Sequence, residues 1–332
     1  MTRLGAMTKT VAAPTTLAQA IKYFANPDVS LDFLVALRWP NGPVCPRCES
    51  AEHSFLSTRR IWKCKGCGKQ FSVKLGTIFE DSPIGLDKWL PAVWLLVNAK
   101  NGISSYELGR ALGVTQKTAW FMLHRIRLAM QTKTFEKMKG SLEVDETYIG
   151  GRARFMHPER KARMLKGRRG GTVGKAAVMG LLSRDERKGH SKVRAEVLGG
   201  GRSRINRRDT RTFIDANVAR GETIVSDQHP SYNHVAERYI HHVIDHGVEY
   251  AKGQVHINGL ENFWSLLKRG IRGTYVSVEP FHLFRYVDEQ VFRFNNRKVR
   301  DVARFVSTVA QIMGKRLTYK QLIGETIAPA TT

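Results

Sequence analysis

Three things are scarce in this sequence of 332 residues: long apolar runs, acidic side chains and cysteines. No apolar run approaches the roughly 18 residues that a membrane-spanning helix needs. The first twenty residues, MTRLGAMTKTVAAPTTLAQA, contain no apolar stretch of signal-peptide length. We therefore expect a soluble, cytoplasmic protein with no membrane partner. Its length exceeds the usual size of one domain, so two or three domains are expected.

The scarcity of acidic residues leaves a large positive charge. The chain has 54 Lys and Arg against 29 Asp and Glu, which gives a net charge of +25 and a pI near 10.2. Such a surplus increases affinity for polyanions and accelerates encounter with them. Nucleic acid is therefore the leading partner.

The only four cysteines form two close pairs, which excludes a disulfide framework as the basis of the fold. The pairs are Cys45-Pro-Arg-Cys48 and Cys64-Lys-Gly-Cys67, separated by 15 residues. Four thiolates in two CxxC turns can complete the tetrahedral shell of one structural Zn²⁺ ion. A redox CxxC pair is the alternative, but it needs no second pair. The basic neighbours suit contact with nucleic acid, although a purely structural ribbon remains possible.

A helical region is expected on both sides of this ribbon. Residues 1–15 resemble a flexible leader, and residues 16–80 contain two short helices, broken near Asn26-Pro27, and the ribbon. Residues 84–135 predict three helices: an apolar helix at 86–97 with Trp89 and Trp94 in the core, a second capped by Ser104 or Ser105, and a third that follows Thr115.

The turn between the last two of these helices contains Gly113, as in a helix-turn-helix. The third helix carries an apolar stripe that we assign to the core: Ala119, Leu123, Ile126 and Met130. Gln116 and Lys117 at its start would then face the DNA groove. The alternative is a three-helix bundle with no role in DNA binding.

An acidic strand, SLEVDETYIGG at 141–151, is unusual in so basic a chain. Alternation places Glu143 on the same face as Asp145 and Glu146 on the opposite face. A carboxylate fixed on a rigid strand is what a divalent metal ion needs, and Asp145 is the main candidate. Glu143 is a weaker one. Taken alone, the pattern also fits a half-exposed edge strand.

The region after this strand predicts a basic loop and then an alternation of strands and a helix. Residues 152–175 hold nine Lys and Arg, including Arg168 and Arg169, which would hold a polyanion unless they are merely solvated. Strands are expected at 176–182 and 193–199, a helix at 210–220, and a strand at 223–227 that ends in Asp227. A histidine-rich connection follows.

A helix expected at 258–271 brings a third carboxylate, Glu261. At about 100° per residue, Asn258, Lys268 and Arg272 fall on the same side as Glu261. Lys268 lies two turns further along and would contact a DNA phosphate. Asn258 could assist a metal ion, and the amide of Asn258 or Asn262 could replace Glu261 as a ligand, but only a carboxylate neutralises charge. Any amphipathic surface helix shows a comparable polar side.

Three carboxylates together can hold two Mg²⁺ or Mn²⁺ ions. In such a pair one ion activates the attacking oxygen and the other stabilises the leaving oxygen at phosphorus. The positive charge and the acidic cluster therefore indicate the same substrate, a nucleic acid.

Four motifs in combination resemble the insertion-sequence transposases of family fifteen-ninety-five, which are related to the eukaryotic Merlin elements. They are VCPRC with KCKGCGKQFSVKLGTIF, LEVDETYIGG, SDQHPSY and HINGLENFWSLLKRGIRGTY. The resemblance covers about residues 20 to 300. It implies a zinc ribbon, a helix-turn-helix and an α/β RNase H-like catalytic domain of the DDE type, expected at 138–310 and followed by a tail at 311–332. It also implies Asp145, Asp227 and Glu261 as the acids, Lys268 as the basic position, and an oligomer on inverted-repeat ends.

The resemblance predicts cleavage at the element ends and joining of the freed 3′-OH to target DNA. One rival is a sequence-specific DNA-binding regulator derived from a transposase, with an inactive catalytic domain. Another is a structure-specific nuclease that cuts but does not join. An intact acidic set argues against the regulator.

Overall fold

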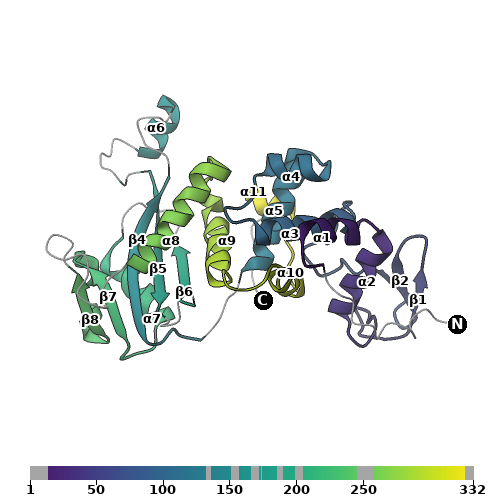
Figure 1. Ribbon diagram of the computed structural model, residues 1–332, viewed down its shortest axis with the longest axis horizontal. Coiled ribbons are helices and arrows are strands. Elements are labelled where there is room, and N and C mark those ends of the chain that lie inside the picture. Colours follow the sequence, from purple (N-terminus) through teal and green to yellow (C-terminus); the bar gives the residue numbers. More distant parts are fainter. Residues whose placement is uncertain are drawn as a thin grey trace. The chain divides into compact units, whose positions relative to one another are not determined.

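The computed structural model describes residues 14–131, 136–150, 157–165, 172, 174–184, 190–198, 205–244 and 258–325. The chain forms two compact units. The first comprises Met1–Met130 together with Val299–Thr332, and the second comprises Gln131–Lys298 (Figure 1). Within the described ranges, no helix is long and apolar enough to cross a membrane.

The first unit begins with two short helices and a small sheet. Helix α1 spans Leu17–Phe24 and α2 spans Pro27–Arg38; Asn26 caps α2 and Pro27 occupies its first turn, which confirms the expected break. Strands β1 (His53–Leu56), β2 (Ile61–Cys64) and β3 (Gln70–Phe71) then form an antiparallel sheet in sequence order. Trp62 and Phe71 stack at 5.8 Å and give this sheet a small core.

Three helices follow in this unit, close to the predicted positions. Helix α3 spans Leu86–Asn98, α4 spans Ser105–Leu112 and α5 spans Gln116–Met130. Ser104 and Glu107 form the capping box of α4, and Gly113 ends it in the left-handed conformation at φ 62°. The apolar stripe of α5 is buried as expected, and so are both tryptophans of α3.

The chain returns to the first unit after residue 298. Helices α10 (Asp301–Ala310) and α11 (Tyr319–Ile323) belong to this unit. The sequence had placed α10 in the catalytic domain and α11 in a tail. The structure differs because the apolar face of α10 is buried against α1, α2 and α3, where Phe305 stacks on Phe33 at 5.8 Å.

The second unit is built on a five-stranded sheet in the order β6-β5-β4-β7-β8. Strands β4 (Ser141–Ile149), β5 (Ala176–Ser183) and β6 (Lys192–Val197) pair antiparallel. Strands β7 (Thr223–Asp227) and β8 (Ile240–Ile244) continue the sheet from β4 in parallel. β4 is therefore the central strand, paired on both sides, and is not an edge strand.

Helices cover both faces of this sheet (Figure 1). Helix α7 (Arg207–Asn217) packs with Leu142 and Val144 of β4 on one face. Helices α8 (Asn258–Arg269) and α9 (Leu283–Asn295) pack on the other face, over Val178 and Leu182 of β5. The alternation of side chains along β4 and β5 divides the core between the two helical layers.

Several elements differ from the sequence prediction. α7 begins three residues early because Asn206 and Asp209 form a capping box. The histidine-rich connection contains β8, in which His241 pairs with Ser226 of β7 through a 2.8 Å hydrogen bond. α8 continues into a π-helical turn at Gly270–Tyr275, and α6 (Pro158–Leu165) and α9 were not anticipated.

Candidate active site and metal centre

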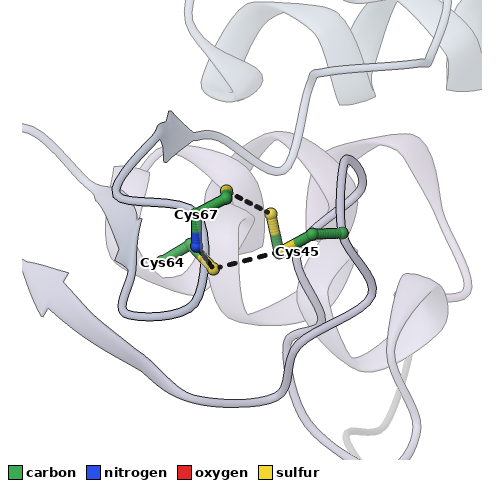
Figure 2. A group of neighbouring side chains, drawn as sticks. Cys45, Cys64 and Cys67 are labelled. Carbon is green, nitrogen blue, oxygen red and sulfur yellow. Dashed lines mark hydrogen bonds between the residues drawn. The ribbon is translucent and has the colours of Figure 1, made fainter.

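The four cysteines come together in the ribbon of the first unit. Their sulfur atoms lie within 4.8 Å of one another. The Sγ atoms of Cys45 and Cys67 are 3.7 Å apart, and those of Cys48 and Cys64 are 3.5 Å apart. Ligands about 2.3 Å from a tetrahedral zinc ion would be separated by about 3.8 Å, so the spacing fits. Figure 2 shows the labelled thiols turned toward one another.

Backbone amides prepare one of these sulfurs for a metal ion. The amide of Cys67 donates to Sγ of Cys64 at 3.5 Å and lowers the pKa of that thiol to about 7. A lower thiol pKa favours the thiolate, which is the form that binds metal. The geometry of the cluster therefore suits a structural ion, and Cys64 is the thiol that loses its proton most readily.

In the second unit, two neighbouring parallel strands carry Asp145 and Asp227. Glu143 of β4 lies opposite Val225 of β7, and Asp145 and Asp227 each lie two residues further along their strands, where the charge of Asp227 acts on Asp145. Adjacent parallel strands lie about 4.8 Å apart, and side chains at matching positions share a face. Both carboxylates are half-buried. Two acids that are 82 positions apart in sequence thus become neighbours.

Asp145 is crowded by negative charge and has one neutral partner on α8. Nε1 of Trp264 donates to Oδ2 of Asp145 at 2.9 Å. Burial, followed by the nearby Glu146 and then Asp227, raises the pKa of Asp145 to about 7. These surroundings destabilise the ionised form of Asp145, and a nearby cation would stabilise it. These residues therefore fit a divalent metal ion.

Trp264 reaches Asp145 only because its neighbour on the sheet is a glycine. Gly180 of β5 lies opposite Asp145, and a Cβ atom there would come within 2.6 Å of the Trp264 ring. The indole occupies the space that a side chain would otherwise fill. Trp264 falls within the helix expected at 258–271, and its place there gives no sign of this contact.

Glu146 lies on the opposite face, as alternation predicts. Its Oε2 accepts a 2.5 Å hydrogen bond from the hydroxyl of Tyr232, whose side chain is buried with α7. Burial raises the pKa of Glu146, although the Tyr232 hydroxyl opposes this. Tyr232 was not singled out from the sequence, and its signal was its place five residues after Asp227 in SDQHPSY.

Glu143 connects β4 to the start of α8. Its carboxylate, 1% exposed, accepts from the amide of Leu260 at 2.7 Å and pairs with Arg184 at 2.8 Å. Burial raises the pKa of Glu143, whereas the Leu260 amide and Arg184 oppose that shift. A carboxylate at the first turn of a helix also meets the positive end of the helix dipole. Glu143 thus holds the helix that carries the third candidate acid.

The contact residues on α8 are spaced at nearly the same distance as their partners on β4. Leu260 and Trp264 lie one turn apart on α8 and meet Glu143 and Asp145, which are two residues apart on β4. Four helical residues rise about 6 Å and two strand residues about 6.6 Å, so the two elements remain in step.

Glu261 is exposed in the first turn of α8, and Asn258 is exposed at its start. Lys268, half-buried two turns along, lies within electrostatic range of Asp145, although burial and Arg272 together lower its pKa.

Among the described residues, the cysteine cluster is the only group of three or more His, Cys, Asp and Glu side chains arranged closely enough to hold a metal ion. Glu261 is thus on the expected helix but does not close a three-carboxylate group with Asp145 and Asp227.

The proposed DNA contacts fall in three places. Gln116 and Lys117 are exposed at the start of α5, where the amide of Gln116 donates to Ser105 at 2.8 Å. Arg272 is exposed in the π-helical turn after α8. Arg168 and Arg169 lie outside the described residues.

Two protein families match separate parts of the chain. A transposase zinc-ribbon domain matches residues 27–70, and an ISXO2-like transposase domain matches residues 137–295. The ribbon and the sheet unit are thus each similar to a domain of insertion-sequence transposases.

A curated relative supports the same class. The chain is 26% identical over 257 residues to a protein of Halobacterium salinarum described as an uncharacterized protein in transposable element ISH50. The match covers 75% of this chain and 84% of the relative. Together with the two domain matches, this relative shows that the chain is similar to the IS1595-type transposases of insertion sequences.

Proposed function

We propose that this protein binds the inverted-repeat ends of its insertion sequence, cleaves them by two-metal phosphodiester hydrolysis and joins the 3′-OH ends to target DNA. The observation that carries the proposal is the closeness of Asp145, on the central strand, to Asp227, at the end of the neighbouring parallel strand, each two residues beyond the paired Glu143 and Val225. The similarity to a transposase domain agrees with it.

The topology of the second unit supports an RNase H-like assignment. Three antiparallel strands are followed by two that run parallel to the first, and helices cover both faces. This arrangement places Asp145 on the central strand and Asp227 on its parallel neighbour. It is a suitable frame for a DDE catalytic domain.

Asp145, Asp227 and Glu261 would hold two Mg²⁺ or Mn²⁺ ions, with Asn258 assisting. When bound, such ions activate the attacking oxygen and stabilise the leaving oxygen. Trp264 orients the carboxylate of Asp145 through its N–H, and Glu143 fixes the helix that carries Glu261. Lys268 would hold a DNA phosphate near Asp145.

The first unit would bind the DNA ends. Helices α4 and α5 with the turn at Gly113 fit a helix-turn-helix, whose second helix would present Gln116 and Lys117 to the major groove. The four thiolates of the ribbon would hold one structural Zn²⁺ ion. Two ends must be brought together for joining, so we expect a homo-oligomer on DNA in the cytoplasm.

The test uses the full-length protein, Mg²⁺ and a labelled duplex taken from the end of the element. Asp145→Asn or Asp227→Asn should reduce nicking by about a thousandfold or more while DNA binding is retained, because the acids act in the chemical step. Glu237→Gln is the matched control, since Glu237 is an exposed carboxylate paired with Arg207 and Arg211. Nicking that survives either Asp variant would refute the assignment.

The same assay separates the rivals. Strand joining by the unmodified protein supports a transposase, cutting without joining supports a nuclease, and binding without cutting supports a regulator. For the third ligand, Glu261→Gln should abolish nicking and Asn258→Ala should only weaken it. The reverse result would assign the role of third metal ligand to the amide of Asn258.

A further inference from the structure

The last described segment of the chain is built into the unit that carries the proposed DNA-binding helices. Phe305 of α10 is fully buried and contacts Trp94 of α3 at 5.1 Å between ring centroids, as well as Phe24 and Phe33. Met313 then pairs with Thr77, and Gly314 donates to the carbonyl of Gly76 at 2.9 Å. Residues 299–325 are therefore a structural part of this unit.

A buried arginine fixes this segment to α5. The guanidinium of Arg125 donates to the carbonyl of Leu317 at 3.0 Å and to those of Ile78 and Glu80 at 3.1 and 2.9 Å. Arg316 pairs with Glu80 at 3.2 Å. Because one side chain of α5 satisfies carbonyls from two distant segments, the position of residue 317 relative to α5 is well defined.

The segment ends beside the first turns of α5, where α11 lies next to that helix (Figure 1). Tyr319 packs edge-on against Phe121 at 5.6 Å, and Nζ of Lys117 lies over the Tyr319 ring, 4.9 Å from its centroid. Thr318 and Gln321 form the capping box of α11, and Leu322 is fully buried below it. The ring beneath Lys117 is thus held from both sides.

We propose that α11 is part of the DNA-binding surface and that Tyr319 is a positioning residue, which holds Lys117 in place for a phosphate of the element end. The inference rests on the proposed binding of DNA through α5. A cation over an aromatic face still has N–H groups that point away from the ring, and Lys117 is exposed. The contact restricts a long flexible side chain without occupying the atoms that a phosphate needs.

This arrangement favours positioning over inhibition. An exposed cation–π contact is weak, and a phosphate bonded to the same ammonium is a stronger partner. The ring therefore cannot withhold Lys117 from DNA. The ring already restricts the Lys117 side chain, so less side-chain entropy is lost when the protein binds DNA.

The test measures binding of full-length protein to a labelled duplex from the element end, over a range of salt concentrations, with a scrambled duplex for comparison. Tyr319→Leu should weaken binding about two- to fivefold, and Tyr319→Phe, which keeps the ring, should bind like the unmodified protein. Lys117→Met should weaken binding and reduce the salt slope by about 0.9. The double variant Lys117→Met with Tyr319→Leu should bind no more weakly than Lys117→Met alone.

The non-additive pair separates positioning from a general loss of structure, because a merely structural tyrosine would weaken binding in the Lys117→Met background as well. Losses that add, unchanged binding by Tyr319→Leu, or tighter binding by Tyr319→Leu, as an inhibitory contact would give, each overturn the inference while the proposed function stands. Failure of the unmodified protein to prefer the element end would overturn both.

Discussion

The cysteine cluster and the carboxylates of the second unit are two candidate metal sites assembled in different ways. The ribbon places four thiols within 4.8 Å of one another using residues 45–67 alone. The carboxylates depend on the register between β4 and β7 and on the contact of α8 with β4, across more than a hundred positions of sequence. The first site is a local structure, and the second is a product of the whole fold.

The difference also appears in what each site is missing. The thiols have the edge lengths of a tetrahedron, whereas Asp145 and Asp227 lie close together but Glu261 is exposed and does not join them. Carboxylates repel one another strongly when they are brought together without a cation. The four thiols can therefore lie close together before a metal ion binds. A group of three carboxylates gains its third member only at a greater electrostatic cost.

Removal of metal from the ribbon should have the largest effect. Zinc-selective chelation, or Cys64→Ser, should abolish the ribbon's structure, since a structural zinc contributes on the order of 10 kcal/mol to folding. Hydrogen exchange should become fast at residues 45–71 and stay slow in β4 and β5, which serve as the internal control. Unchanged protection of the ribbon without metal would mean that its packing, and not an ion, holds it.

Loss of Glu143 should have the next largest effect and should act on the carboxylate site through α8. Glu143→Ala removes the buried ion pair with Arg184 and leaves the Leu260 amide without this acceptor, so the free energy of unfolding should fall by about 3–5 kcal/mol. Denaturant unfolding measures this, with Glu196→Ala, an exposed carboxylate on β6, as the control.

A second variant, Glu143→Gln, tests whether the charge of Glu143 positions α8. Under conditions where this variant remains folded, Glu143→Gln should lower the affinity of the protein for Mg²⁺ and leave the position of Asp145 unchanged. If the Glu143→Gln variant binds Mg²⁺ as tightly as the unmodified protein, α8 does not need a charged side chain at position 143.

Proton competition at Asp145 should have the smallest effect. The pKa of Asp145 is raised from 3.8 to about 7, so between these values the folded protein holds a proton that the unfolded chain lacks. Without metal, stability should therefore fall as pH rises through this window, and Mg²⁺ should restore it. Mg²⁺ affinity should drop by up to about tenfold for each pH unit below about 7.

Calorimetric titration of Mg²⁺ at several pH values measures this linkage, and Asp145→Asn should remove its contribution. An affinity that does not change with pH would show that Asp145 is already ionised in the metal-free protein. The thiol site should respond to acid as well, because Cys64 must lose a proton to bind metal.

Short-range features were predictable from sequence because their signals are local. The CxxC spacing, the caps at Asn26 and Ser104 and the buried stripe of α5 all depend on residues a few positions apart. Alternation along β4 also placed Glu146 on the face opposite Asp145, as the Tyr232 contact shows. These are consequences of helix and strand periodicity.

Contacts between distant segments were beyond the sequence. Nothing near Trp264 indicates that its N–H reaches Asp145, because the contact needs Gly180 on a third element. The position of α10 was likewise misjudged, since its apolar face fits the sheet unit and the helical unit equally well by pattern. Only the aromatic cluster around Phe305 decides between them. The roles assigned to Asp145, Asp227, Glu261 and Lys268 remain predictions.

The return of residues 299–325 to the first unit makes the second unit an insert joined to its host at both ends. A single cut at either connection would leave both halves of the host joined through their shared aromatic core. The sheet unit is thus connected to its host like a cassette, at two points, so the sequences of the two units can change separately wherever both connection points are kept.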